Sequence, residues 1–129
     1  AGAHCNAISD GTMPTTAITH WTRDRTRGPK LSLEHMVHHQ TQRTAAHVGW
    51  HDRGVVAPGY LADLNVIDLE RLALRPPHLA ADLPAGGTRL LQEATGYVAT
   101  LKRGVPTVEH GKLTGERPGS LQRGPKPLT

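Results

Sequence analysis

The sequence predicts a mixed α/β fold, in which two helices are followed by short antiparallel strands. Two segments in the N-terminal half, residues 12–24 and 32–49, carry apolar residues at helical spacing. The stretch 54–68 contains a tight turn followed by a strand-like run. Between residues 94 and 113, strand-like runs alternate with turns that contain Gly, which is the pattern of a β-meander.

The first predicted helix covers Thr12–Asp24. Pro14 suits its first turn, where a missing N–H leaves no hydrogen bond unmade. Ala17, Ile18 and Trp21 then recur at helical spacing, so one side of this segment is predicted to face other parts of the protein.

The second predicted helix starts after the breaker Gly28-Pro29. Ser32 is placed to accept a hydrogen bond as its N-cap, and Glu34 favours the positive N-terminal end. Gly49 is expected to end this helix as the residue that takes positive φ. The predicted apolar face comprises Leu33, Met36, Val37, Thr41, Thr44, Ala45 and Val48.

The central stretch, residues 54–68, is predicted to be a turn that leads into a half-buried strand. Pro58-Gly59 suits a type II turn, because Pro fixes φ at the second position and Gly takes positive φ at the third. By the two-residue period of a strand, Leu64 and Val66 fall on one face and Ile67 on the other.

The segment after Asp68 alternates between loops and strands. Residues 69–77 are predicted to be irregular because they end in Pro76-Pro77, and residues 82–87 read as a loop. A continuous strand is expected over 94–101, followed by turns at 103–104 and 109–112.

The totals limit what this chain can contain. It has 129 residues, whereas a whole (β/α)8 barrel needs about 250. Hydrophobic residues make up 36%, there is no Phe, and ten Pro and fourteen Gly interrupt the chain. This is a thin apolar supply for a core. The composition therefore predicts a segment that packs against other polypeptide.

Charge and cysteine content bear on partners and location. The net charge is +4, but no run of basic residues exceeds two. This pattern favours a solvated basic surface, and a small binding module for anions or nucleic acid is the alternative. The single Cys5 favours a reducing compartment, and no apolar run could span a membrane, so a cytoplasmic protein is predicted.

Histidines offer two candidate groupings. His35 and His39 share a helix face at the spacing that two-His metal motifs use, but no acidic third ligand follows. His38 occupies the position at which the inverted zinc-protease motif requires Glu. We therefore expect a solvated helix face and no metal ligands here.

A set of residues in the central stretch resembles a family signature. The pattern comprises Gly54, Pro58-Gly59, Ala62-Asp63-Leu64 and Asp68. It resembles the C-terminal signature of the amidohydrolase superfamily, in which the chain leaves a metal-bearing barrel and returns to a small β-sandwich. The likeness covers nearly the whole chain.

Motifs at both ends narrow the resemblance to the D-aminoacylase-like branch, the N-acyl-D-amino-acid deacylases. Gly2-Ala3-His4 is similar to the Gly-rich stretch after the eighth barrel strand of those enzymes. Similar to their closing strands are Gly96-Tyr97, Gly104-Val105-Pro106, His110-Gly111-Lys112, Thr114-Gly115 and Pro118-Gly119. A hydantoinase-like tail is the alternative, because the C-terminal signature is shared more widely than the substrate.

The resemblance implies a domain organisation. Residues 1–53 would be the last loop and helices of an incomplete TIM-type (β/α)8 barrel. Residues 54–115 would supply strands and a connecting loop of the C-terminal β-sandwich, and residues 116–129 an extended basic tail.

The resemblance also implies a function. The parent enzyme would use zinc to hydrolyse the amide bond of N-acyl-D-amino acids, with its zinc ligands and catalytic aspartate upstream of Ala1. This chain alone would then hold no catalytic or metal-binding residue and be inactive. His4 would contact the substrate, since it follows the eighth strand at the mouth of the barrel.

The expected partners follow from the same reading. They are the N-terminal remainder of the enzyme and the small-molecule substrate, with no nucleic acid and no membrane. Strands that lack their usual neighbours expose backbone edges, so the isolated chain is expected to self-associate.

Overall fold

The computed structural model describes residues 10–127. Helices and antiparallel strands both occur, which confirms the predicted mixed class. The chain forms two compact units, one from the residues up to Lys30 with Leu69–Gly96, the other from Leu31–Asp68 with the residues from Tyr97 onward. The predicted boundaries after residues 53 and 115 remain a prediction.

The first unit begins with a helical run that confirms the helix predicted over residues 12–24. It consists of a 3₁₀ turn, η1 (Asp10–Thr12), then α1 (Met13–Ile18), then a π-helical turn, η2 (Thr19–Asp24). Hydroxyl groups bond back to carbonyls four residues earlier, Thr19 to Thr15 at 3.0 Å and Thr22 to Ile18 at 2.6 Å. Such bonds compete with the regular helical pattern where η2 begins.

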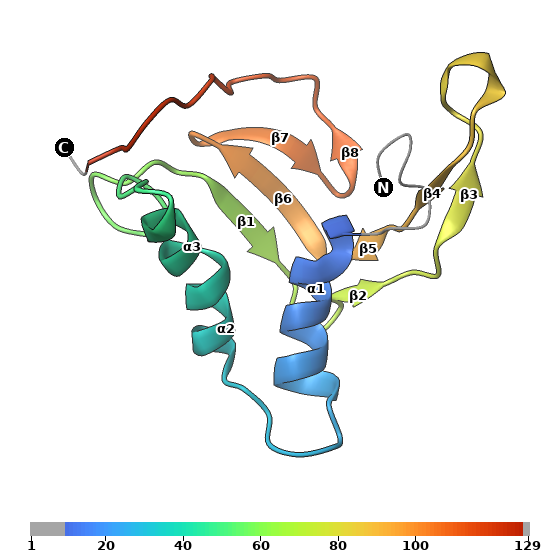
Figure 1. Cartoon of the computed structure of the whole chain (residues 1–129), viewed down its shortest axis with the longest axis horizontal. Coiled ribbons are helices and arrows are strands. Elements are labelled where there is room, and N and C mark those ends of the chain that lie inside the picture. Colours follow the sequence, from blue (N-terminus) through green and yellow to red (C-terminus); the bar gives the residue numbers. More distant parts are fainter. Residues whose placement is uncertain (1–9, 128–129) are drawn as a thin grey trace. The chain divides into compact units, whose positions relative to one another are not determined.

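Four short strands of the first unit form two antiparallel pairs (Figure 1). β2 (Ala73–Leu74) pairs with β5 (Ala94–Thr95), and β3 (His78–Ala80) pairs with β4 (Arg89–Leu91) around the predicted loop that holds η3 (Pro84–Gly86). The prediction that residues 69–77 are wholly irregular is wrong. Proline interrupts a ladder only at its own position, so β2 forms before Pro76-Pro77.

The prediction of one continuous strand over residues 94–101 is also wrong. Gly96 has φ of 90° and separates β5 from β6 (Tyr97–Lys102). A Cβ on Gly96 would lie 2.6 Å from the backbone N and Cα of Leu72. Glycine is therefore required here both for its positive φ and for the close approach of the two backbones.

Arg23 links the helical run of the first unit to the segment after Asp68. Its guanidinium donates hydrogen bonds to the carbonyl oxygens of Leu69 at 2.7 Å and Leu72 at 2.9 Å, and it also pairs with Asp24 at 2.6 Å. One side chain thereby satisfies carbonyl groups of a segment that lies far away in the sequence.

The second unit opens with two helices, α2 (Leu33–Gln40) and α3 (Gln42–His47). The predicted N-cap is confirmed, because the Ser32 hydroxyl accepts a hydrogen bond from the His35 N–H at 3.2 Å. Gly49 has φ of 75°, as predicted for the end of the helical segment.

The second helical segment is broken at Thr41, which corrects the prediction of a single helix. Thr41 has φ of −123° and ψ of −92°, and its hydroxyl donates to the Val37 carbonyl at 2.7 Å. No residue of α2 or α3 is buried, and Val37 and Val48 are 42% and 54% exposed. The apolar face predicted for this segment is thus only partly covered in the described part of the chain, where Leu33, Met36 and Ala45 are half-buried.

The strands of the second unit form one antiparallel sheet in the order β1-β6-β7-β8 (Figure 1), where β1 is Leu64–Ile67, β7 is Val105–Glu109 and β8 is Lys112–Leu113. The predicted meander β6-β7-β8 is confirmed. Its turns place Arg103 and His110 at positive φ, each followed by a glycine.

β1 joins the outer side of β6. Its register shifts between Val66 and Ile67, and Val66 is 48% exposed. The predicted strand is therefore present, but Val66 does not contribute to a buried face.

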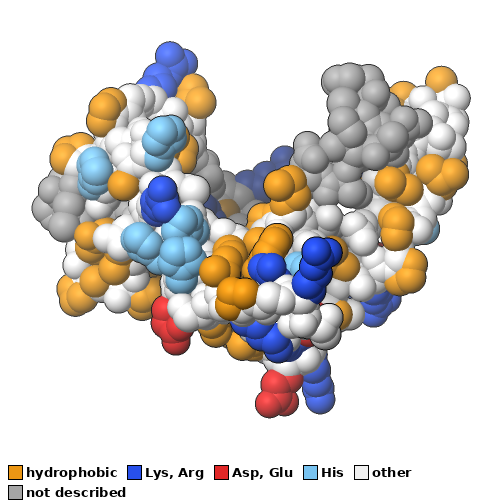
Figure 2. Space-filling model, turned by 60° about the horizontal axis from the view of Figure 1, so that its bottom comes forward, with side chains coloured by type: hydrophobic (Ala, Val, Ile, Leu, Met, Phe, Trp, Pro, Cys, Tyr) orange, Lys and Arg blue, Asp and Glu red, His pale blue; other side chains and the backbone are white. Residues whose placement is uncertain are grey.

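Few apolar side chains are buried. Among the described residues the buried hydrophobic side chains are Ile18 and Leu72, which are 8% and 0% exposed. Both belong to the first unit, where Thr15 and Thr19 are also buried. Figure 2 shows hydrophobic side chains spread over one face of the molecule. This agrees with the thin apolar supply of the sequence.

The predicted basic tail is extended and is tied back to the second unit. Lys126 forms a parallel bridge with Trp50. The His51 N–H donates to the Lys126 carbonyl at 2.7 Å, and the Lys126 N–H donates to the Gly49 carbonyl at 2.8 Å. Within residues 10–127, no helix has the length and hydropathy needed to cross a membrane.

Candidate functional site

The predicted substrate contact, His4, lies outside the described residues, as does Cys5. The candidate site that the structure does describe surrounds the central stretch, residues 54–68, in the second unit.

The turn in this stretch has the predicted form. The Tyr60 N–H donates to the Ala57 carbonyl at 3.2 Å, and Gly59 has φ of 88°. These are the hydrogen bond and the positive φ that a type II turn at Pro58-Gly59 requires. Just beyond, the Leu61 N–H donates to the Asp52 carbonyl at 2.8 Å, which closes the loop on itself.

Gly54 lets this loop approach the break between α2 and α3. It has φ of 87°, and an added Cβ would lie 2.8 Å from the N and Cα atoms of Gln42 and 2.9 Å from the carbonyl carbon of Thr41. Real Cβ atoms do not approach backbone this closely, so the first glycine of the signature has a packing role.

Asp63 connects the loop to the hairpin of β6 and β7. One carboxylate oxygen accepts from the Lys102 ammonium at 2.5 Å, and the other accepts from the Arg103 N–H at 3.0 Å. The Arg53 guanidinium lies 3.5 Å away. The Gly104 N–H also donates to the Ala62 carbonyl at 2.9 Å, so two successive residues hold the turn at 103–104.

The surroundings of Asp63 favour its charged form. Burial alone would raise the pKa of this carboxyl, but the hydrogen bonds from Lys102 and Arg103, together with the charges of Lys102 and Arg53, hold it below its ordinary value. The pKa of Asp52 is likewise lowered, chiefly by its hydrogen bond from Arg53.

Arg53 lies between two acidic groups and an aromatic ring. Its side chain is 10% exposed and pairs with Asp52 at 2.8 Å. Its guanidinium also lies 4.8 Å from the centre of the Trp50 ring, which is a cation–π distance. We name the charged residues Asp52, Arg53, Asp63 and Lys102 the Asp63 cluster.

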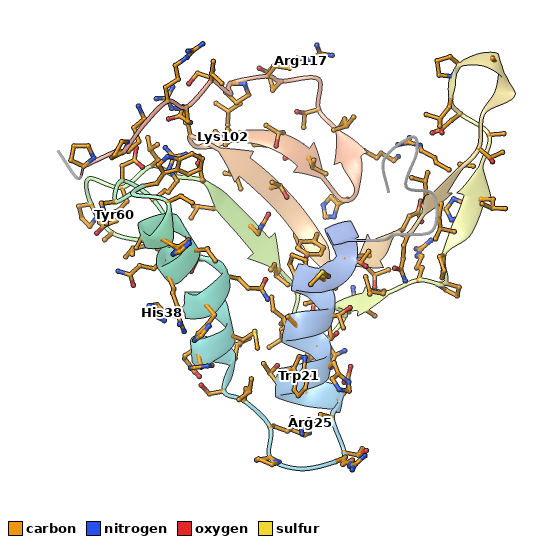
Figure 3. The ribbon with its side chains drawn as sticks, viewed as in Figure 1. Trp21, Arg25, His38, Tyr60, Lys102 and Arg117 are labelled. Atoms are coloured by element: carbon orange, nitrogen blue, oxygen red, sulfur yellow. The ribbon has the colours of Figure 1, made fainter. Side chains whose placement is uncertain are left out.

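An open groove of 590 Å³ adjoins the Asp63 cluster on the face of β1 and β6. Two of its lining residues are cross-strand neighbours, and the Thr100 hydroxyl donates to the Asn65 side-chain oxygen at 2.8 Å. Arg117 also lines the groove. It belongs to the extended segment after β8, where Figure 3 labels it.

The chemistry of the Asp63 cluster is that of a structural latch. Its acids and bases neutralise one another in pairs, and a lowered carboxyl pKa is the opposite of what a general base near neutral pH requires. The cluster fixes the loop at residues 52–63 to the turn at 103–104.

The histidines of α2 come close together on the helix surface. The rings of His35 and His39 lie 4.2 Å apart between centroids, and the ring of His38 lies 6.0 Å from that of His39. Over residues 10–127, no group of three or more His, Cys, Asp or Glu side chains is arranged to hold a metal ion.

Asp63 belongs to the family signature, but its pairing with Arg53 and Lys102 is not predicted from the sequence. The Asp52-Arg53 neighbours were a usable signal, whereas the pairing of Asp63 with Lys102 depends on the register of β1 against β6.

Comparison with known proteins identifies the family. Residues 3–108 match the model of the amidohydrolase family, which comprises hydrolases. No curated protein and no solved structure matches the chain. The matched region includes the helices, the signature stretch 54–68 and most of the meander. The chain therefore belongs to the amidohydrolase family.

Proposed function

We propose that the chain is the C-terminal part of a zinc-dependent enzyme that hydrolyses the amide bond of N-acyl-D-amino acids. The observation that carries this proposal is the family match over residues 3–108. The choice of the D-aminoacylase-like branch rests on the resemblance of Gly2-Ala3-His4 and of the closing-strand motifs to those enzymes. The single cysteine favours the cytoplasm as the location.

In this proposal the reaction needs groups from the preceding polypeptide. A zinc ion held there would polarise the amide carbonyl and activate a water molecule. The catalytic aspartate would precede Ala1, and His4 would contact the substrate at the mouth of the barrel.

The present chain would complete the architecture around that centre. α1, α2 and α3 would close the barrel, and the sheet of β1, β6, β7 and β8 would form part of a β-sandwich. The uncovered apolar residues Val37 and Val48 support this role, since a helix face of this kind normally packs against other polypeptide. The Asp63 cluster would hold the strands in register.

The experiment uses a longer polypeptide that contains this chain behind its preceding sequence. We expect it to bind zinc and to hydrolyse N-acetyl-D-amino acids in preference to their L enantiomers, and we expect zinc removal to abolish turnover. His4→Ala should raise KM more than it lowers kcat if His4 only binds substrate.

Two outcomes would argue against the proposed substrate or the proposed chemistry. Preferential opening of hydantoin rings would favour the hydantoinase-like alternative within the same family. Full activity after zinc removal would contradict the proposed chemistry. The 129-residue chain alone serves as the inactive control.

A further inference from the structure

The exposed side of α2 brings two imidazole rings together. His35 and His39 are one helical turn apart, and their ring centroids lie 4.2 Å from each other with an angle of 41° between the planes. The Ser32 cap fixes the start of this helix, which sets the positions of both residues.

Both rings can be reached from solvent. His35 is exposed and His39 is partly exposed. His38 projects from the same helix, as Figure 3 shows, and its ring lies 6.0 Å from that of His39. Histidine side chains gather on the face shown in Figure 2. An ion could therefore approach without rearrangement of the backbone.

The sequence favours a solvated face here, but because the two rings lie 4.2 Å apart we propose that His35 and His39 together chelate one divalent transition-metal ion of the Ni²⁺, Cu²⁺ or Zn²⁺ class. Imidazole nitrogen suits these metals, and residues four apart on a helix share a face. Small rotations of the two side chains would bring one nitrogen of each to about 2.0–2.1 Å from a common ion. Water completes the coordination, because no third His, Cys, Asp or Glu in residues 10–127 is grouped with this pair.

Arg43 opposes this binding. Its guanidinium nitrogen lies 2.8 Å from Nε2 and 3.2 Å from Nδ1 of His39, so it competes for the lone pair that the metal needs. Its positive charge also repels a cation. Arg43 is thus expected to lower the affinity of this site for the metal ion.

The test is a titration of the full chain, without an affinity tag, with NiCl₂ by isothermal titration calorimetry at neutral pH. Imidazole signals in NMR spectra report which rings bind. We expect one site that is lost in His35→Gln and in His39→Gln. His78→Gln, an exposed histidine of β3, is the matched control and should bind as the unaltered chain does.

Arg43→Gln separates this site from nonspecific binding by histidines. It should raise the affinity, because it removes both the competing donor and the repelling charge. Circular dichroism of each variant checks that the helices are retained. The proposal is overturned if the unaltered chain binds no Ni²⁺, if folded His35→Gln and His39→Gln bind as well as it does, or if Arg43→Gln does not bind more tightly.

Discussion

The Asp63 carboxylate lies 2.5 Å from the Lys102 ammonium, although 39 residues separate them in the sequence. The pairing of β1 with β6 brings these residues together, since Leu64 lies opposite Leu101 in the register. The acidic residue of the family signature thus connects the loop at residues 52–63 to the hairpin of β6 and β7.

Replacing Asp63 with Asn should destabilise the second unit. The change removes a charge-assisted bond to Lys102 in a site where the Asp63 side chain is only 22% exposed, so we expect a loss of about 1–3 kcal/mol. Urea denaturation measures this loss. Asp82→Asn is the control, because the Asp82 pair with Arg89 is more exposed and should contribute less to stability. Equal losses would argue against the latch.

The contribution of Asp63 should depend on pH. Its pKa in the folded chain is lowered, so its stabilising effect is fully present above the ordinary carboxyl pKa of about 3.9. The effect declines as the pH falls below that value towards the folded pKa. The difference in urea stability between the unaltered chain and Asp63→Asn should therefore shrink between pH 7 and pH 3. A constant difference would contradict this reasoning.

Gly54→Ala should lower the stability of the fold more than the same substitution at a glycine that has a similar φ but lies in open space. Gly54 and Gly115 have φ of 87° and 93°, but an added Cβ meets Gln42 backbone at 2.8 Å only at Gly54. At Gly115, where nothing lies within 4 Å, we expect a loss of about 1–2 kcal/mol from the backbone conformation alone. Thermal unfolding followed by circular dichroism compares the Gly54→Ala and Gly115→Ala variants. Equal shifts in their unfolding temperatures would contradict the packing role of Gly54.

Leu72→Ala should destabilise the first unit strongly. Leu72 is fully buried, so its truncation should cost about 2–5 kcal/mol. Leu79→Ala is the matched control, since Leu79 is 69% exposed and its loss should stay within about 0.5 kcal/mol. Hydrogen exchange of the β2 and β5 amides would locate the effect. Unchanged protection in Leu72→Ala would contradict the role of this residue in the core.

Short sequence patterns correctly predicted the caps and turns that depend only on adjacent residues. The Ser32 cap, the Pro58-Gly59 turn and the meander turns each depend on a few adjacent residues, and the structure confirms them. The breaks at Thr41 and Gly96 were not predicted, and a distant segment closely approaches each of them. Gly54 approaches the first and Leu72 the second, and no local pattern encodes either contact.

In the candidate site, too, local features could be predicted from the sequence and contacts between distant residues could not. The signature residues could be recognised by their pattern, but the partners of Asp63 follow from strand register. The family membership was accessible because the signature is local. The zinc centre and the role of His4 stay predictions, since they depend on residues outside the described part of the chain.

The isolated chain should self-associate through the outer strands of its sheet. In the described part β1 pairs only with β6 and β8 only with β7, so each presents an edge. Val66 on β1 and Leu113 on β8 are 48% and 84% exposed, and exposed apolar edges favour pairing between chains. Size-exclusion chromatography with light scattering should show a mass that rises with concentration.

Charged substitutions test whether these edges are responsible. Val66→Lys and Leu113→Lys should reduce the association, because a lysine on an edge strand disfavours pairing with another chain. Leu121→Lys is the control, since Leu121 is 76% exposed but lies in the extended tail outside any strand. A monodisperse monomer of the unaltered chain at high concentration would refute the prediction. Association reduced equally by all three substitutions would instead show that general hydrophobicity, and not the strand edges, drives it.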